Sequence, residues 1–419
     1  MPNPALIGYW HNWNDANAPY IPLDQIDPRY NVIEIAFAVP TSPTDMTMVF
    51  VPDGVSQGTF ISQIQQLQSL GKKVLLSIGG ANASIDLTTT LNKNAFVNSI
   101  TTIVNTYGFD GIDIDIEHGN SILISGGTIL SPTNNAQINL IDAIKQIMAN
   151  YRTTHPQKLL LTMAPETAYV QGGQSAFSGI WGGYLPIIHG LSDSLDILQV
   201  QLYNSGTMYG IDGNIYTQGT GDFIVAMTEA VIHGFQTTTG GMFIGLPASK
   251  VAVGLPACMS AAGGGYADTS TVNAAMAYLR GNGPQQGSYT LAAEGGYPSL
   301  RGMMTWSINW DAVNTCASDY QFAEQFEHIF DDVIPSSVND KFPKQNAFSF
   351  YPNPSEDFIT LTHSSNSNME KIIYIYNIHG DMVMSSPLDD GNNSINISHL
   401  PGGIYLLKYN QEFQRLFKL

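Results

Sequence analysis

Short apolar runs rich in β-branched residues recur along much of the chain, and their number and spacing constrain the fold more than any other feature. The runs start roughly 25–55 residues apart, which is the length of one strand, one helix and their loops. We expect strands at Leu6–Trp10, Val32–Phe37, Val74–Ile78, Gly111–Glu117, Leu159–Ala164, Ile197–Tyr203, Val251–Leu255 and Gly302–Ser307.

Several stretches between these runs carry helical periodicity. Phe60–Leu70 and Ala136–Met148 each place their apolar residues on one helical stripe. Eight strands alternating with helices predict an α/β fold, and favour a (β/α)₈ TIM barrel over a doubly wound sheet. Only about 45 residues separate the last two strands, too few for an inserted domain, so we expect an open groove.

The pattern changes near residue 346, where short strand-like runs alternate with Gly, Asn, Asp and Pro. These runs predict a small all-β sandwich, and they are Phe358–Thr362, Ile372–Tyr376, Met382–Met384, Ile395–Ile397 and Ile404–Lys408. The stretch before them lacks periodicity and contains Pro335 and Pro343, which is typical of a linker. We therefore expect a barrel domain at residues 1–330, a linker at 331–345 and a β-sandwich domain at 346–419.

Charged side chains make up only 12% of the 419 residues, and the formal net charge is −18. Nucleic acids and anionic membranes require a cationic surface, so we expect neither as a partner. No apolar run reaches the roughly 18 residues that span a bilayer. A surface rich in neutral polar groups suits hydroxyl-rich ligands instead.

The chain opens with Met1-Pro2-Asn3-Pro4 directly before the first expected strand, so we find no signal peptide. Either a leader has been removed or the protein is cytoplasmic. The two cysteines, Cys258 and Cys316, favour two buried thiols over a disulfide, although the sequence does not settle their pairing. The nine histidines show no metal-ligand spacing, and we expect neither a metal nor a cofactor.

The segment Phe109–Glu117 (FDGIDIDIE) alternates acids with isoleucines. Side chains alternate between the two faces of a strand, so Asp113, Asp115 and Glu117 share one face. In a barrel the isoleucines would face the helices and the acids would face the barrel axis. Burying three acids costs free energy, which a purely structural strand would avoid.

The spacing of these acids predicts a shared proton. Acids two positions apart lie about 7 Å apart, and at an effective dielectric constant near 20 their charges repel by roughly 2.4 kcal/mol. The set should therefore retain one proton at neutral pH. Glu117 lies at the C-terminal end of its strand, where barrel active sites open, and is the candidate general acid. The alternatives are a polar plug and a metal site, and no ligand cluster supports the latter.

The motif Asp110-Gly111-x-Asp113-x-Asp115-x-Glu117 resembles the signature of glycoside hydrolase family 18. Its continuation through His118 and Gly119 is similar to plant class III chitinases and their single-domain bacterial relatives. Further segments resemble the family's motifs on other strands, in barrel order: Gly8-Tyr9-Trp10, Ser77-Ile78-Gly79-Gly80, Met163-Ala164-Pro165-Glu166, Gln199-Val200-Gln201-Leu202-Tyr203-Asn204 and Met304–Asp311.

The resemblance implies an endo-acting chitinase that hydrolyses β-1,4 bonds between N-acetylglucosamine units with retention of configuration. Glu117 would protonate the glycosidic oxygen, and the substrate's own 2-acetamido carbonyl would attack C1. Asp115 would bind the acetamido N–H, and Asp113 would exchange a proton with Asp115. The hydroxyl of Tyr203 would hold the acetamido oxygen in position.

The resemblance also implies how the substrate is bound. Trp306 would form the floor beneath the −1 sugar, since the apolar face of a pyranose stacks on an aromatic ring; a core tryptophan is the alternative. Trp181 would contribute to a plus-side subsite. The other residues expected to line the pocket are Tyr9, Met163, Glu166, Gln201 and Asn204.

The C-terminal part resembles the sorting domain of the type IX secretion system of Bacteroidetes. The matching features are Tyr351-Pro352-Asn353-Pro354, Ile372–Tyr376, Leu400–Tyr405 and Lys418. They imply a secreted or cell-surface monomer with the secretion machinery as a partner. This route requires a signal peptide. The lack of one in this sequence therefore calls into question whether the N-terminus is complete, more than whether the protein is exported. A carbohydrate-binding module is the alternative for this domain.

Two other functions stay open. The same acid motif occurs in enzymes that cleave N-glycan cores or peptidoglycan, and the same barrel occurs in chitin-binding proteins without turnover. Inactive members of the family usually lack the final acid of the motif, so Glu117 favours activity.

Overall fold

The computed structural model describes residues 1–313, 318–330, 348–363, 371–377, 381–389, 392–409 and 412–419. The chain divides into two compact units, Met1–Val333 and Ile334–Leu419. The predicted linker, residues 331–345, lies outside the described residues.

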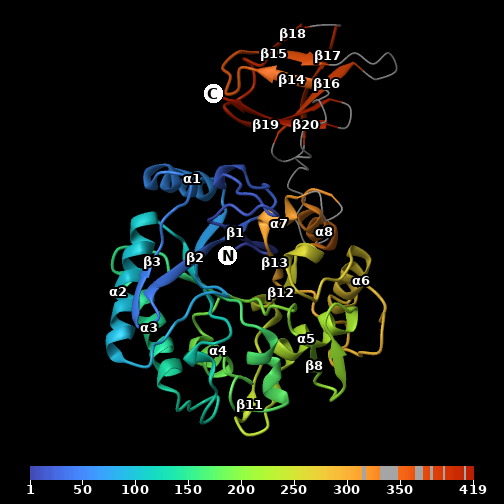
Figure 1. Ribbon diagram of the computed structural model, residues 1–419. Helices are drawn as coiled ribbons and strands as arrows, with labels where there is room; N and C mark the ends of the chain where they lie inside the picture. Colours follow the sequence, from blue (N-terminus) through green and yellow to red (C-terminus); the bar gives the residue numbers. More distant parts are fainter. Residues whose placement is uncertain (314–317, 331–347, 364–370, 378–380, 390–391, 410–411) are drawn as a thin grey trace. The chain divides into compact units, whose positions relative to one another are not determined.

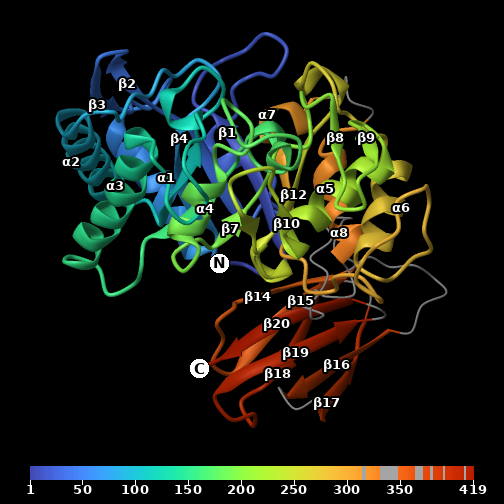
Figure 2. The same cartoon turned by 90° about the horizontal axis from the view of Figure 1, so that it is seen from below.

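In the described part of the first unit, eight parallel strands form a barrel with helices around it (Figures 1 and 2). The strands are β1 (Ala5–His11), β2 (Val32–Ser42), β4 (Lys73–Gly79), β5 (Gly111–Asp115), β6 (Leu160–Met163), β7 (Ile197–Leu198), β12 (Ala252–Pro256) and β13 (Gly302–Trp306). Hydrogen-bonded neighbours run in the order β12-β13-β1-β2-β4-β5-β6-β7. Parallel bridges Leu198–Val251 and Gln201–Gly254 join the two ends. The predicted TIM barrel is confirmed.

The helices lie outside this ring and cover its strands (Figure 2). They are α1 (Gln57–Ser69), α2 (Thr90–Tyr107), α3 (Asn135–Arg152), α4 (Leu185–Leu191), α5 (Gly221–His233), α6 (Thr269–Leu279), α7 (Ile308–Asp311) and α8 (Gln321–Phe330). Side chains of Ser56 and Thr89 accept the backbone N–H three residues on, which starts α1 and α2. The predicted stretch Phe60–Leu70 lies within α1 except for Leu70, which caps it, and Ala136–Met148 falls within α3.

Apolar residues pack in two places in the barrel unit. The larger cluster fills the layer between strands and helices and includes Ile112, Ile114 and Ile116. A smaller one lies among the inward-facing residues and includes Tyr9 and Met304. The isoleucines of β5 therefore face the helices, and the acids between them face the inside of the barrel.

Two barrel strands, β5 and β7, are shorter by two residues or more at the carboxyl end than the sequence pattern predicts. β5 ends at Asp115, before Glu117, because its neighbours stop there: Gly79 of β4 pairs with Asp115, and Met163 of β6 pairs with Ile114. β7 covers only Ile197–Leu198, and beyond it isolated bridges replace the ladder. Short antiparallel strands that the sequence analysis missed lie in the connections: β3 (Asp45–Val49), β8 (Thr207–Tyr209), β9 (Ile215–Thr217), β10 (Phe235–Gln236) and β11 (Met242–Phe243).

Cys258 is disulfide-bonded. The preference for two unpaired thiols was therefore wrong for this residue, because cysteine spacing carries no information on which side chains meet. Cys316 lies outside the described residues.

The second unit consists of two antiparallel sheets. One has the order β14-β15-β18 and the other β17-β16-β19-β20. The strands are β14 (Phe348–Tyr351), β15 (Phe358–His363), β16 (Ile372–Asn377), β17 (Met382–Pro387), β18 (Asn392–Asn396), β19 (Gly403–Tyr409) and β20 (Glu412–Lys418). Apolar side chains of both sheets, such as Ile359, Ile375 and Leu407, share one buried core. The all-β prediction is confirmed; β14 and β20 are additions to it.

Within the described residues, every helix is too short or too polar to serve as a membrane span.

Candidate active site

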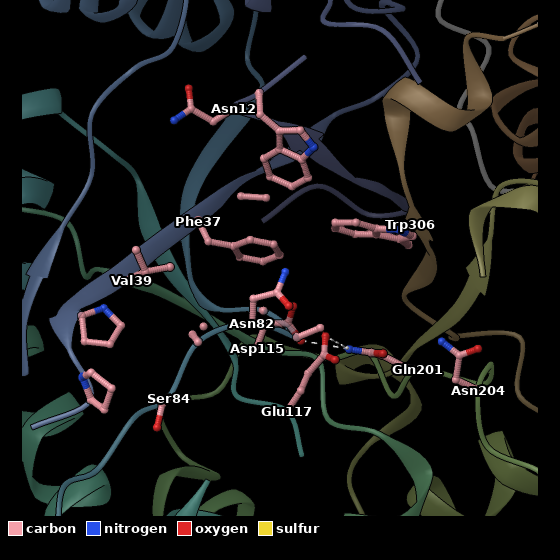
Figure 3. Close-up of a pocket in the computed structure, with 18 of the residues that line it drawn as sticks. Asn12, Phe37, Val39, Asn82, Ser84, Asp115, Glu117, Gln201, Asn204 and Trp306 are labelled. Atoms are coloured by element: carbon pink, nitrogen blue, oxygen red, sulfur yellow. Dashed lines mark hydrogen bonds between the residues drawn. The ribbon is translucent and has the colours of Figure 1, made fainter. Parts of the chain in front are cut away.

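A pocket of about 880 Å³ opens at the carboxyl ends of the barrel strands, a size typical of small-ligand sites. Figure 3 shows acids, amides and aromatic rings from several strands converging on it. Asp115 and Glu117 form its acidic wall, and Phe37 and Trp306 form an aromatic one.

Three acids run from the barrel interior to this pocket. Asp113 and Asp115 are buried, whereas the Glu117 side chain keeps 15% of its surface exposed. Gly79 brings β4 close to this strand: it has φ +121°, and a Cβ on it would overlap the carbonyl oxygen of Asp115. The close approach therefore requires glycine, in agreement with a structural role for this residue.

Three hydroxyl groups surround the innermost acid, Asp113. Its Oδ2 accepts hydrogen bonds from Tyr9 Oη at 2.8 Å and Ser77 Oγ at 2.7 Å, and its Oδ1 lies 2.8 Å from Thr162 Oγ1. Burial raises the pKa of Asp113, and these hydrogen bonds oppose the rise. The residue is thus equipped to carry a negative charge inside the barrel.

Asp115 has the opposite tendency. Burial raises its pKa well above the usual value, and the neighbouring charges of Glu117 and Asp113 raise it further. Burial and the neighbouring charges therefore favour the neutral form of Asp115. Its Oδ1 accepts a hydrogen bond of 2.9 Å from Gln201 Nε2, which also lies 3.3 Å from Glu117 Oε1 and so links the two acids (Figure 3).

Burial also raises the pKa of Glu117, and the hydrogen bond from Gln201 opposes that rise. The charge of Glu166 adds to the upward shift. Glu166 follows β6, and its Oε2 accepts the backbone N–H of His118 at 3.2 Å. A carboxylic acid at the mouth of a pocket, with a raised pKa, is suited to give and take a proton.

Glu117, His118 and Glu166 bring three potential ligand atoms within 4.8 Å of one another. This proximity is not evident from the sequence, because Glu117 and His118 follow β5 whereas Glu166 follows β6. Such groups are common without an ion, and we assign them no metal; the expectation of a metal-free site remains a prediction.

The aromatic wall continues beyond the residues predicted from sequence. The Trp306 ring lies nearly parallel to that of Phe37, with centroids 5.9 Å apart, and Trp13 lies 6.2 Å from Phe37. Both additional residues line the pocket. Phe37 ends one expected strand and Trp13 lies just beyond another, and these positions were the available signal, since the carboxyl ends of the strands converge on the mouth of a barrel.

Tyr203 lines the pocket on the side of the acids. Burial, followed by the charges of Asp115 and Glu117, raises the pKa of its phenol well above 10. The hydroxyl therefore keeps its proton and can act as a hydrogen-bond donor toward a ligand.

The structure places the predicted site residues in different surroundings. The pocket is lined by Asp115, Glu117, Gln201, Tyr203, Asn204 and Trp306. Asp113, Tyr9 and Met163 are buried beneath it. Glu166 lies beside Glu117 through His118, and Trp181 is partly buried against the main core and is absent from the pocket lining.

The fold and this site together define a TIM-barrel protein in which a row of acids leads into the pocket at the carboxyl ends of the strands. The chain belongs to the glycosyl hydrolases family 18, whose pattern it matches over residues 5–344. Residues 349–418 match the secretion system C-terminal sorting domain. Both resemblances inferred from the sequence motifs are confirmed.

Similar proteins include Chitinase Chi52 from Paenibacillus xylanexedens, which is 45% identical over 310 residues, and Chitinase D from Niallia circulans, which is 45% identical over 311 residues. Each alignment covers 73% of this chain but only 58% of the relative. Among solved structures, a family GH18 chitinase from Chromobacterium violaceum aligns with a TM-score of 0.70 and 37% identity, over 78% of this chain and 83% of that one.

Proposed function

We propose that the protein is a chitinase that cleaves β-1,4 bonds within chains of N-acetylglucosamine, by a retaining mechanism assisted by the substrate. The observation that carries the proposal is the stack of acids ending in Glu117 at the edge of an aromatic-walled pocket. The names of the similar proteins support the substrate class.

In the first step Glu117 donates its proton to the glycosidic oxygen, and the bond between that oxygen and C1 breaks. The acetamido oxygen of the same sugar attacks C1, so that no protein carboxylate becomes attached to the sugar. Tyr203 orients the acetamido oxygen, and Asp115 accepts the acetamido N–H. Glu117 then removes a proton from water, which opens the oxazolinium ring.

The inner acid, Asp113, assists by carrying a negative charge. When Asp115 turns its proton toward Glu117, Asp113 is left ionised, and its hydroxyl donors stabilise that charge. Trp306 provides a flat apolar surface beneath the sugar in the −1 subsite. We propose substrate contacts also for Gln201, Asn204 and Glu166.

We propose that the two parts of the chain have separate functions. Residues 1–330 carry catalysis, and residues 346–419 address the protein to the type IX secretion machinery, which implies a location outside the cell or on its surface. Residues 331–345, outside the described residues, would link the two. The protein would act as a monomer, without metal or cofactor.

Product analysis tests the reaction. We expect chitin pentamer and hexamer to be cut at internal bonds, with the newly formed reducing ends appearing first as the β anomer, because attack by the acetamido group and then by water inverts C1 twice. Chromatography that resolves anomers within the first minutes measures this. Initial α products would contradict the mechanism, binding without products would indicate a chitin-binding protein, and cleavage of N-glycan cores or peptidoglycan alone would indicate the other hydrolases.

Removal of the second unit tests the export proposal. In a host with a type IX system, and with a signal peptide supplied, a chain ending at residue 345 should remain in the periplasm while keeping chitinase activity in cell lysates. The full chain should reach the medium or the cell surface. Fusing residues 346–419 to an unrelated periplasmic reporter is the matched control. Efficient export of the shortened chain would contradict the proposed role.

A further inference from the structure

A fourth acid, Glu34, lies inside the barrel, and the proposed mechanism gives it no part. It comes from β2 and is fully buried. Both its carboxyl oxygens lie 2.7 Å from Gln199 Nε2, and its Oε1 lies 2.8 Å from Thr162 Oγ1. The same Thr162 oxygen lies 2.8 Å from Oδ1 of Asp113, so one hydroxyl bridges two buried carboxyl groups.

The number of protons at this bridge is limited. A threonine hydroxyl has one proton, so it can donate to only one of the two carboxyl oxygens. For the other contact to be a hydrogen bond, the carboxyl group must donate to Thr162. One of Glu34 and Asp113 must therefore be protonated for both contacts to be satisfied.

The surrounding donors indicate which acid holds this proton. Asp113 already receives two hydroxyl donors on its other oxygen, from Tyr9 and Ser77. Glu34 has contacts with Thr162, the amide group of Gln199 and Tyr9, and the single hydroxyl proton of Tyr9 is directed to Asp113. Charge is therefore better stabilised on Asp113, and the proton belongs on Glu34.

We propose that Glu34 is a protonated positioning residue: it donates to Thr162, which then directs its own proton to Asp113. These two hydrogen bonds give Asp113 a third hydroxyl donor, which stabilises its ionised form. The inference rests on the proposed function, because it is in the reaction that Asp113 must carry its charge without the proton of Asp115, which turns toward Glu117.

The electrostatic environment agrees with this assignment. Burial raises the pKa of Glu34 well above its usual value, and the charge of Asp113 adds to the rise, while hydrogen bonds from Thr162, Gln199 and Tyr9 oppose it. The titratable groups that face this region are Tyr9 from β1, Asp113 and Asp115 from β5, and Tyr203 after β7. Ionising Glu34 would place a second negative charge beside Asp113, which the barrel interior strongly disfavours.

Two substitutions separate the proposed role from simple filling of space. Glu34→Gln keeps a donor toward Thr162, and its remaining oxygen still accepts from Gln199, although the second contact with the Gln199 amide is lost. We therefore expect a kcat within about threefold of the wild-type value. Thr162→Val removes the bridge while keeping the shape, and we expect kcat to fall about tenfold or more with KM nearly unchanged, since a hydrogen bond to a charged group is lost. Thr305→Val is the matched control, because its hydroxyl is buried without a hydrogen-bond partner among the described residues.

Infrared difference spectra of the full chain test the proton directly. At neutral pH the wild-type minus Glu34→Gln spectrum should contain the carbonyl band of a protonated carboxylic acid. A carboxylate band instead, or wild-type kcat in Thr162→Val, would overturn the inference. The spectra do not depend on turnover. A protein that failed to hydrolyse chitin oligosaccharides would refute the proposed function, and the carboxyl band would still show whether Glu34 is protonated.

Discussion

We expect Glu117→Gln to lower kcat on chitin hexamer by about 10³- to 10⁴-fold, the upper part of the roughly 10²- to 10⁴-fold that general acid–base catalysis supplies. Such a loss corresponds to roughly 4–5.5 kcal/mol of transition-state stabilisation. The amide has the shape of the acid but cannot give a proton to the glycosidic oxygen. In the wild-type structure Gln201 Nε2 lies 3.3 Å from Glu117 Oε1. The oxygen of the glutamine side chain can still accept this hydrogen bond, so the pocket should keep its shape.

Substrate binding should be nearly unaffected by this change. Titration calorimetry of the variant with chitin hexamer should give a Kd within a few-fold of the value expected from the wild-type KM. Glu294→Gln is the matched control, since that side chain is exposed in the same unit, and it should leave kcat unchanged. If Glu117→Gln retained more than about a tenth of the wild-type kcat, the assignment of the general acid would be wrong.

The second large effect is expected for Asp115→Asn, with kcat lowered by about 10²- to 10³-fold, as for the loss of one preorganised electrostatic contact. Burial and neighbouring charges raise the pKa of Asp115 and so favour its neutral form, which asparagine resembles. The substrate should therefore bind, and KM should change little. What the amide cannot do is pass its proton along the stack and offset the positive charge that develops at the sugar.

Kinetics on chitin hexamer measure this split between kcat and KM. Asp193→Asn, at an exposed position of the same unit, is the control for loss of a carboxylate. A variant in which KM rises while kcat is preserved would mean that Asp115 only binds the substrate. That outcome would remove the charge-stabilising role from the mechanism.

The barrel and the line of acids could be predicted from the sequence, for a local physical reason. Side chains on a strand alternate between two faces, so the isoleucines and acids of Gly111–Asp115 were assigned to opposite sides without knowledge of their neighbours. The structure has the same arrangement: Ile112 and Ile114 pack toward the helices, and Asp113 and Asp115 point inward. The number of barrel strands could also be predicted, since each strand contains its own apolar run.

The ends of the elements were less predictable. The pattern extended the acid strand to Glu117, whereas β5 ends at Asp115. Where a strand stops depends on whether its neighbours still offer backbone partners, and those neighbours are distant in sequence. For Glu117 the difference matters, because a residue just past the ladder can lie at the pocket.

Alternation within one strand was thus enough to find three acids, but not the partners that set their protonation. Gln201 and Thr162 touch the acids from other strands, and Glu34 was hidden in an otherwise apolar run as a single charged residue. Hydrogen bonding and burial depend on contacts between strands tens of residues apart, which only the closed barrel creates. For the same reason the bonded state of Cys258 and the position of Trp181 away from the pocket lining emerged only from the folded chain.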